Sequence, residues 1–344
     1  MGTMNNTSKI RVLLVGATNP LGKEILSGLM SQKEQFEISV FDRKTSANMT
    51  FLEKHKGTIT VYYGDILDEE ALREACAGQD FVIHNNSLPR EQASKSLKQA
   101  EAINVLGTHN LVETLEQYSP TALLLYISTM GVYGDRLKSP MISAQDIPGP
   151  VLGDYDAITK MQAEKIVREA SLDWIIYRPG YILYTQGIKL SPEIFKTPLS
   201  TRMELIHAQD LSTAVIKSYE QRNRLWGHIY NVGGGEACRI TYEQLIKRFL
   251  SELHIDFKDI PDHSFATRNG SGGYFADSNS LNDQIGFRTY SIDRYFEELG
   301  KSKGLLKRVS SALFGSVRGK SLFAQSEPLK AHKSGDPIRS KYFF

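Results

Sequence analysis

The chain has 344 residues, of which 41% are hydrophobic and 23% charged, and its net charge is +2. That length can bury a sizeable core, as one large domain or a two-lobed unit. Two cysteines give no disulfide framework, and neither a signal peptide nor a run of about 18 apolar residues is found, so we expect a cytoplasmic protein. Residues 301–344 hold ten basic and two acidic side chains, which leaves the rest of the chain net acidic and argues against nucleic-acid binding through a broad basic face.

Short apolar runs alternate with helical stretches through the first half of the chain. We expect strands at residues 9–15, 37–41, 59–63, 81–84, 122–127 and 173–177. Helices are expected between and after them, at residues 22–31, 69–77, 100–117 and 157–170. Several strand runs are apolar almost without interruption, which is typical of a parallel sheet covered on both faces. The alternation predicts the α/β class, as a doubly wound parallel-sheet Rossmann fold with right-handed crossovers.

The alternation breaks near residue 181. Loops rich in Gly, Pro and Ser follow at residues 187–201 and 269–274. Between and around these loops we expect helices at 208–221 and 242–253 and a strand at 228–232. This part of the sequence indicates a smaller lobe that returns to the main sheet.

The first expected strand runs into a turn that reads Gly-Ala-Thr-Asn-Pro-Leu-Gly at residues 16–22, and a helix follows. Such a turn points backbone N–H groups and the helix dipole at a pyrophosphate. Gly16 and Gly22 hold the outer glycine positions, where the backbone approaches the phosphate and where helix meets strand. Asn19 replaces the middle glycine, and because Asn tolerates positive φ we expect the turn to survive. Pro20 presets φ for the start of the helix.

Asp42 ends the second expected strand, 20 residues after Gly22. A carboxylate at that place accepts hydrogen bonds from the adenosine ribose hydroxyls of a dinucleotide. The alternative is that Asp42 only opens a turn. Its negative charge would repel a 2′-phosphate and favours NAD, whereas Arg43 could bind that phosphate instead. NAD is therefore the expected cofactor, and NADP is the less favoured one.

Five later stretches form an ordered set. They are Gly64-Asp65-Ile66, residues 80–84 followed by Asn85 and Asn86, residues 104–111, residues 128–134, and Arg178-Pro179-Gly180. In order and spacing this set resembles the extended short-chain dehydrogenase/reductase family, the group of nucleotide-sugar epimerases and dehydratases and of 3β-hydroxysteroid dehydrogenases. The resemblance implies a Rossmann dinucleotide-binding domain at residues 8–180, a mostly substrate-binding lobe at 181–300 with elements returning to the main sheet, and a basic C-terminal extension at 301–344.

The glycine turn, Asp42 and the resemblance together predict a cofactor-binding set. Its members are Gly16, Thr18, Asn19, Pro20, Leu21, Gly22, Asp42, Arg43, Asp65, Ile66, Asn85, Asn86, Lys160 and Pro179.

The resemblance also implies catalytic residues. Thr129 would hydrogen-bond the substrate oxygen that gains or loses hydride, and the alternative is a strand-end hydroxyl bonded to backbone. The family's catalytic pair is a Tyr and, four residues later on one helix, a Lys that lowers the pKa of the phenol. Here Lys160 follows Tyr155 by five residues, so a regular helix would place the two on different faces. Alignment on Lys160 puts Asp156 in the place of the tyrosine.

Three explanations of this spacing stay open. A bulge or a late helix start could return Tyr155 to the site. Asp156 could instead serve as a carboxylate base one turn before Lys160. In the third explanation the proton-transfer groups are lost, and the protein binds a dinucleotide without ordinary turnover. An Asp–Lys pair at four-residue spacing is also a common helix-stabilising ion pair.

The leading hypothesis is an NAD(P)-dependent oxidoreductase or epimerase/dehydratase that acts on a secondary alcohol or ketone of a small molecule such as a nucleotide sugar. The alternative hypothesis is a catalytically reduced dinucleotide-binding regulator or scaffold, similar to the NmrA-like proteins. The histidines are scattered singly, without a carboxylate or Cys at metal-ligand spacing, so we expect no metal site.

The basic extension and two helices suggest partners. Residues 304–323 have apolar residues every four positions between basic ones, which is typical of a basic amphipathic helix. It could contact an anionic membrane surface or a partner, or dock on the body of the protein itself, and its glycines favour the last of these. The family resemblance also implies a homodimer formed through the helices expected at 100–117 and 157–170.

Overall fold

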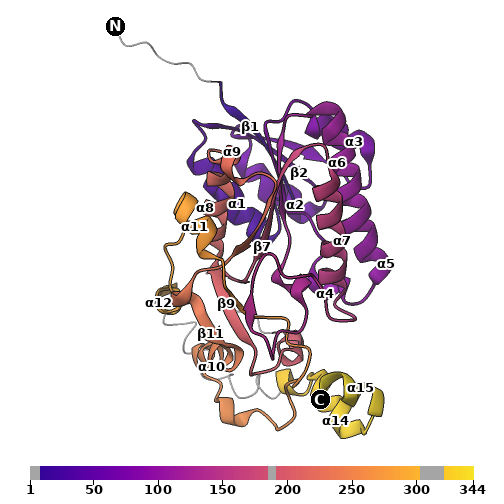
Figure 1. Ribbon diagram of the computed structural model, residues 1–344, viewed down its shortest axis with the longest axis vertical. Coiled ribbons are helices and arrows are strands. Elements are labelled where there is room, and N and C mark those ends of the chain that lie inside the picture. The colour runs from indigo at the N-terminus through magenta and orange to yellow at the C-terminus, as the bar shows by residue number, and fades with distance from the viewer. Residues whose placement is uncertain (1–7, 185–190, 303–320) are drawn as a thin grey trace.

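A seven-stranded parallel sheet lies at the centre of the larger part of the molecule (Figure 1). The computed structural model describes residues 8–184, 191–302 and 321–344. The strands of this sheet are β1 (Ile10–Val15), β2 (Phe36–Asp42), β3 (Ile59–Tyr63), β4 (Phe81–His84), β5 (Leu123–Ile127), β7 (Asp173–Pro179) and β10 (His228–Val232). Their order across the sheet is β10-β7-β5-β4-β1-β2-β3, and every neighbouring pair is parallel. The predicted doubly wound Rossmann fold is confirmed.

Helices cover both faces of the sheet (Figure 1). On one face lie α1 (Pro20–Ser31), α8 (Ala208–Ser218) and α11 (Asn279–Ile285), and on the other lie α3 (Glu69–Cys76), α6 (Gly107–Tyr118) and α7 (Tyr155–Glu169). Successive side chains of β1 point to opposite faces of the sheet. Val12 and Leu14 pack on the face covered by α1, α8 and α11, and Leu13 and Val15 pack on the face covered by α3, α6 and α7. An apolar residue at every position of the strand is therefore what burial on both faces requires.

A smaller lobe lies at the carboxyl edge of the sheet (Figure 1). Its strands are β8 (Tyr181–Leu183), β9 (Arg202–His207) and β11 (Arg239–Thr241), with a separate pair made by β6 (Met141–Ile142) and β12 (Tyr274–Phe275). Its main helices are α10 (Tyr242–Glu252) and α12 (Ile292–Ser302). Asp210 on α8 joins this lobe to the sheet, because its carboxylate accepts hydrogen bonds from the amides of Thr289 and Tyr290, each at 3.0 Å.

Short elements complete the described chain. The α-helices are α2 (Ser46–Leu52), α4 (Arg90–Ala93), α5 (Leu97–Ala100), α9 (Arg222–Leu225), α14 (Glu327–Ser334) and α15 (Pro337–Phe343). The 3-10 turns are η1 (Glu53–His55), η3 (Met130–Tyr133), η4 (Pro192–Lys196), η5 (Glu236–Cys238) and η6 (Phe257–Asp259). A π-helical stretch, η2 (Glu101–Leu106), separates α5 from α6.

The π-helical stretch interrupts the single helix that we predicted at residues 100–117. Within it, the buried side chain of Asn104 accepts a hydrogen bond from the Leu88 amide at 2.7 Å and donates one to Thr159 Oγ1 at 2.9 Å. These two bonds link the loop after β4 with α7. The helical periodicity of the sequence could not reveal this wider π-helical turn. The turn is accompanied by hydrogen bonds of Asn104 to Leu88 and Thr159, which are distant in sequence.

A buried ion pair fixes α7 against β7. Two guanidinium nitrogens of Arg178, Nε and Nη2, lie 2.9 Å and 2.6 Å from the carboxylate oxygens of Glu164, and the two side chains are 2% and 4% exposed. Ser128 donates a further hydrogen bond to Glu164, and Arg178 Nη1 donates to Tyr133 Oη at 2.9 Å. Each guanidinium nitrogen and each carboxylate oxygen of the pair thus has at least one hydrogen-bond partner, as a buried charge pair requires.

We expect Glu164→Gln to lower the free energy of unfolding by about 3–5 kcal/mol, because the buried Arg178 charge loses its counter-charge. Urea denaturation measures this. The matched control is Lys165→Gln, which removes an exposed pair with Glu169 at 3.8 Å and should change the free energy of unfolding by less than about 1 kcal/mol. Equal urea concentrations at the unfolding midpoints of Glu164→Gln and Lys165→Gln would contradict the prediction.

A second buried polar group, His84, ends β4 and is fully inaccessible to solvent. Its Nε2 lies 2.9 Å from Thr108 Oγ1, and that hydroxyl already donates its hydrogen to Asn104 O at 2.6 Å. His84 Nε2 must therefore carry the proton of this bond, while Nδ1 is buried without a hydrogen-bond partner among the described residues. Burial, followed by the nearby charge of Lys160, lowers the pKa of His84 from 6.5 to about 3. The unfolded chain consequently takes up a proton at a higher pH than the folded chain does.

The free energy of unfolding should decrease as the pH is lowered from about 6.5 to about 3, because the unfolded chain protonates His84 before the folded chain does. Between neutral pH and about pH 5, the free energy of unfolding of the wild type should decrease by about 2 kcal/mol more than that of His84→Gln. Denaturant unfolding at the two pH values measures the difference. A substitution of the exposed His228 by Gln should keep the wild-type pH dependence, and a His84→Gln protein that also kept it would refute the prediction.

Candidate dinucleotide-binding and catalytic site

The glycine turn between β1 and α1 lies where the winding of the sheet reverses, because β1 pairs with both β2 and β4. Gly16 has φ +88°, and a Cβ there would lie 2.9 Å from Asn86 Cα. A Cβ on Gly22 would lie 2.1 Å from the carbonyl oxygen of Gly16. Neither position has room for a side chain, so the turn folds tightly against both β4 and its own helix.

Asn19 corrects one expectation about this turn. Its φ is −72°, so the residue does not use the positive φ that we invoked to explain the missing glycine. Asn19 instead caps α1, because its Oδ1 accepts a hydrogen bond from the Gly22 amide at 2.8 Å. Its Nδ2 donates to Asn85 O at 2.9 Å, and Asn85 Nδ2 donates back to Gly16 O at 3.0 Å. The asparagine thus ties the turn to the end of β4.

Few amides of the turn remain free to bind a phosphate. The Thr18 amide donates to Asp42 Oδ2 at 2.9 Å, Pro20 has no N–H, and the Gly22 amide is capped by Asn19. The hydrogen bonds of the described residues give the amides of Ala17, Asn19 and Leu21 no acceptor. The Leu21 amide lies in the first turn of α1, where the helix dipole favours an oxygen of a pyrophosphate.

Asp42 is buried at the end of β2, and protein groups already occupy both of its oxygens. Oδ2 accepts from the amide and hydroxyl of Thr18 at 2.9 and 2.8 Å, and Oδ1 accepts from the Arg43 amide and from Asn48 Nδ2, both at 2.9 Å. Ribose hydroxyls at this carboxylate would replace Thr18 Oγ1 or Asn48. Sequence reasoning missed Asn48, since an Asn inside a helix carries no signal of a partner six residues earlier.

The other predicted cofactor residues lie near the carboxyl ends of their strands, which share one edge of the parallel sheet. Asp65, just after β3, is exposed, and its Oδ1 accepts from the Leu67 amide at 3.0 Å. Ile66 is buried and faces Gly107 of α6. Asn86 borders Gly16, as described above, and Pro179 is the buried last residue of β7. The side chain of Arg43 is exposed.

Helix α7 contains no bulge that would correct the spacing of Tyr155 and Lys160. It runs as α-helix from Tyr155 to Glu169, and Asp154 caps it by accepting from the Ala157 amide at 3.2 Å. Tyr155 packs against an apolar cluster of Leu88, Ala93 and Ala100. The structure therefore separates Tyr155 from the face that carries Lys160.

Asp156 and Lys160 share one face of α7. Lys160 Nζ lies 3.8 Å from Asp156 Oδ1, and the side chains are 14% and 12% exposed. Their charges act on the sheet beneath them: Lys160 contributes to the lowered pKa of His84, and Asp156 contributes, after burial and Glu164, to the raised pKa of Tyr126. The pair thus lies over the ends of β4 and β5.

Thr129 lies beside the first turn of this helix. Its Oγ1 accepts from the Gly131 amide at 3.1 Å and caps the 3-10 turn η3. A Cβ on Gly131 would lie 3.2 Å from Ala157 Cβ, so η3 packs directly on α7. The backbone-bonded alternative for Thr129 is therefore present, and its hydroxyl hydrogen is still available to a ligand.

Tyr133, a second phenol near this turn, serves the core. It donates to Asn231 Oδ1 at 2.6 Å and accepts from Arg178. Burial raises the pKa of Tyr133 to about 12, although the charge of Arg178 opposes the shift. A phenol held in this way is a poor proton acceptor at neutral pH.

The described residues contain neither a metal-binding cluster nor a membrane-spanning helix. Across residues 8–184, 191–302 and 321–344, no three His, Cys, Asp or Glu side chains gather as a metal site would require. Within the same residues no helix is both long and apolar enough to span a bilayer.

Known proteins resemble this chain in sequence. A profile of the 3-beta hydroxysteroid dehydrogenase/isomerase family matches residues 13–223. The human 3 beta-hydroxysteroid dehydrogenase type 7 is 25% identical over 282 residues, which cover 73% of this chain and 75% of the human protein. The rat protein of the same name is 29% identical over 251 residues, covering 70% and 69%.

Solved structures resemble the fold. UDP-glucuronic acid 4-epimerase from Bacillus cereus, in complex with UDP-glucuronic acid and NAD, superposes with a TM-score of 0.69 at 18% identity, over 85% of this chain and 98% of that one. A double mutant of dTDP-glucose 4,6-dehydratase from Streptomyces venezuelae, with NAD bound, gives a TM-score of 0.68 at 20% identity, over 91% and 100%. The resemblance to extended short-chain dehydrogenases/reductases is confirmed. This chain belongs to the 3-beta hydroxysteroid dehydrogenase/isomerase family.

Proposed function

We propose that this protein is an NAD-dependent enzyme that oxidises a secondary alcohol, or reduces the corresponding ketone, on a small molecule. The family match and the dehydrogenases, epimerases and dehydratases among its relatives support an enzyme of this class. The observation that carries the proposal is the Asp156–Lys160 pair, nearly buried on the inner face of α7.

The residues of the glycine turn would hold the dinucleotide. Structural neighbours are crystallised with NAD, which supports NAD as the cofactor here. The Leu21 amide and the start of α1 would bind the pyrophosphate, and Asp42 would face the adenosine ribose. The carboxylate of Asp42 disfavours the 2′-phosphate of NADP, although the exposed Arg43 follows it. When bound, NAD supplies the acceptor or donor of a hydride at its nicotinamide ring.

Asp156 would exchange the proton of the substrate hydroxyl. Its carboxylate would accept the proton in the oxidation of an alcohol, and the resulting carboxylic acid would return the proton in the reduction of a ketone. Lys160 would keep that carboxylate oriented and would also bind the nicotinamide ribose. Thr129 would bond the same substrate oxygen with its free hydrogen. Tyr155, packed against Leu88 and Ala93, has no part in this proposal.

The second candidate is a dinucleotide-binding regulator without turnover. The packing of Tyr155 away from Lys160 favours it, because the family's usual proton donor is then absent from the site. Calorimetry and turnover measurements separate the two candidates.

We expect the purified protein to bind NAD⁺ and NADH more tightly than NADP⁺ and NADPH in isothermal titration. With NAD⁺, a panel of 3β-hydroxysteroids and sugar nucleotides should yield a substrate whose oxidation is followed by NADH absorbance. Asp156→Asn should then lower kcat by about 100-fold or more, the usual contribution of a general base. Tyr155→Phe, the neighbouring control, should change kcat by less than about threefold.

Three outcomes would overturn parts of this proposal. A large loss in Tyr155→Phe with normal activity in Asp156→Asn would return the tyrosine to the mechanism. Tight NADH binding without turnover on any panel member would favour the regulator. Failure to bind any of the four dinucleotides would remove the cofactor assignment.

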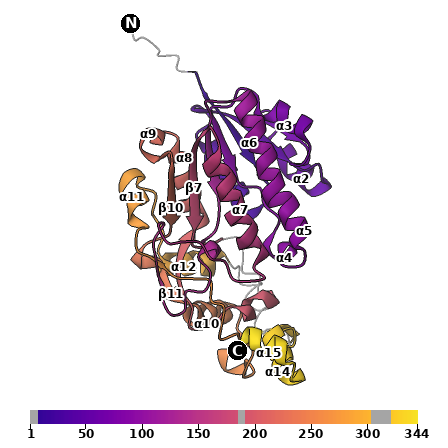
Figure 2. The same ribbon diagram turned by 45° about the vertical axis from the view of Figure 1, so that its right-hand side comes forward.

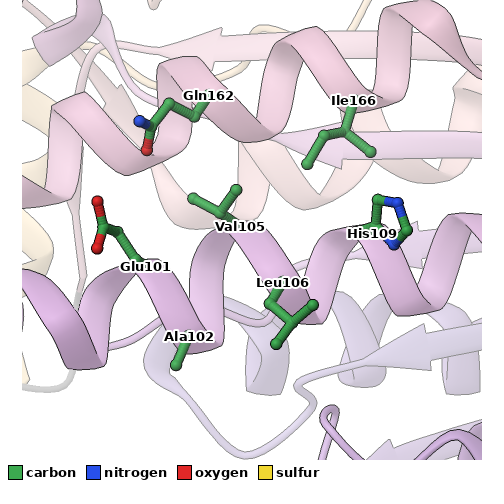
Figure 3. A pocket seen from close by; sticks show the side chains of 7 residues that line it. All are labelled: Glu101, Ala102, Val105, Leu106, His109, Gln162 and Ile166. Atoms are coloured by element: carbon green, nitrogen blue, oxygen red, sulfur yellow. The ribbon is translucent and has the colours of Figure 1, made fainter.

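We also infer that two copies associate through η2, α6 and α7. A groove of about 420 Å³ lies between these helices (Figure 3). It is mostly apolar and is lined by Glu101, Ala102, Val105, Leu106, His109, Gln162 and Ile166. Leu106 is 51% exposed although it is a large apolar side chain. A second copy related by a two-fold axis would bring the same apolar strip opposite itself and cover it.

Leu106→Glu should therefore convert a dimer into a monomer, because two buried carboxylates would face each other across the axis. Size-exclusion chromatography with light scattering gives the mass. Leu67→Glu, a change of similar chemistry at a 38% exposed leucine outside the groove, should leave the dimer intact. A wild-type protein that is monomeric at every concentration tested would refute the inference.

The two buried, unpaired cysteines, Cys76 and Cys238, support a cytoplasmic location. Most of the amphipathic segment at 304–323 lies outside the described residues, so its contact with a membrane or a partner stays a prediction.

A further inference from the structure

Asp42 is a buried carboxylate whose lone pairs are all in use. It is 8% exposed, and each of its oxygens accepts two hydrogen bonds from the protein. The two oxygens of a carboxylate offer about four lone pairs in all, so the four donors occupy them completely. A ribose hydroxyl that binds Asp42 must therefore displace one of the donors that the free protein supplies.

The four donors differ in how easily they can leave. Two are backbone amides, of Thr18 in the glycine turn and of Arg43 at the end of β2, and neither can move without the chain around it. The Thr18 hydroxyl binds the same oxygen as its own amide, at 2.8 and 2.9 Å, and belongs to the turn that would hold the pyrophosphate. The fourth donor, Asn48 Nδ2, comes from α2, outside both the turn and the sheet.

Helix α2 lies at the outer edge of the larger part of the molecule (Figure 2). Leu52, its last residue, is buried, and Phe51 packs partly on the same core. Residues 43–47, which lead to Asn48, are exposed. A segment with few buried apolar contacts moves at low free energy cost. The start of α2 is therefore the support of Asp42 that is most easily displaced.

Asn48 holds its place through a single amide group. Its Nδ2 donates to Asp42 Oδ1 and to Arg43 O, both at 2.9 Å, so both hydrogens of that nitrogen are used. Asn48 is only partly buried, so water can replace its bond to the Arg43 carbonyl when the side chain rotates outward. Asp42 Oδ1 would then accept a hydrogen bond from a ligand hydroxyl in place of the amide.

We propose that Asn48 occupies the ribose position on Asp42 in the free protein and that the adenosine ribose of the dinucleotide displaces it. Asn48 thus competes with the ligand, and the affinity for NAD is lower than Asp42 and the glycine turn alone would give. The cost is one intramolecular hydrogen bond, which binding breaks. The proposal rests on the proposed function in one respect, that Asp42 faces the adenosine ribose.

Isothermal titration of the full-length protein with NAD⁺ and with ADP tests this. Asn48→Ala removes the competing donor, so it should bind both ligands about fivefold more tightly than the wild type does, the equivalent of one net hydrogen bond. 2′,3′-Dideoxyadenosine 5′-diphosphate has no hydroxyl for Asp42, and its affinity should be the same for the two proteins. The control is Met49→Ala, at the next residue of α2, whose side chain is 41% exposed. It should leave all three affinities unchanged.

Three results would overturn the proposal. Weaker or unchanged binding of NAD⁺ to Asn48→Ala would show that Asn48 does not compete with the ligand. A gain in Thr18→Val, with none in Asn48→Ala, would show that the ribose displaces the Thr18 hydroxyl instead. An equal gain for the dideoxy ligand would show that Asn48→Ala acts through the shape of α2 and not at Asp42.

These results are distinct from a failure of the proposed function. In each of them the protein still binds NAD⁺, so the cofactor assignment stands and only the role of Asn48 is refuted. Failure of the wild type and of every variant to bind any of the ligands would remove the cofactor assignment and the role of Asn48 together.

Discussion

The orientation of α7 depends on the buried pair of Glu164 and Arg178. Asp156, Lys160 and Glu164 follow each other at four-residue spacing, so the helix carries all three on one side. Once Glu164 is drawn to Arg178 in the core, the same side faces the ends of β4 and β5, and Asp156 and Lys160 come to lie there. Tyr155 is turned by about 100° from Asp156 and meets a different surface.

The glycine turn shows how a substitution within a family motif is accommodated. Replacement of the middle glycine by Asn19 removes no room that the turn needs, because the residue has an ordinary negative φ. The side chain then supplies the cap of α1 and a link to Asn85. In exchange the Gly22 amide is no longer free for a phosphate. In the proposed function the pyrophosphate would therefore rely on the amides without an acceptor, Leu21 among them, and on the helix dipole.

The two lobes are joined by polar contacts as well as by the chain itself. Asp210 on α8 holds the segment before α12, and Asn231 at the end of β10 bonds both Tyr133 and Asp277. Substrate would enter between parts that are therefore fixed relative to each other, which suits a site that must hold a reacting oxygen within hydrogen-bond distance.

The sequence by itself determined the class of fold, the order of its strands and helices, and the position of the glycine turn. Each of these follows from local patterns: apolar runs of strand length, 3.6-residue periodicity, and glycines where no side chain fits. It also placed Asp156 one turn before Lys160, since spacing along a helix is a local property. The π-helical stretch at Asn104, the partners of Asp42 and the packing of residues 321–344 on the smaller lobe were decided only by the tertiary structure. Each depends on groups that are far apart in the chain and meet only when the sheet and the two lobes are assembled.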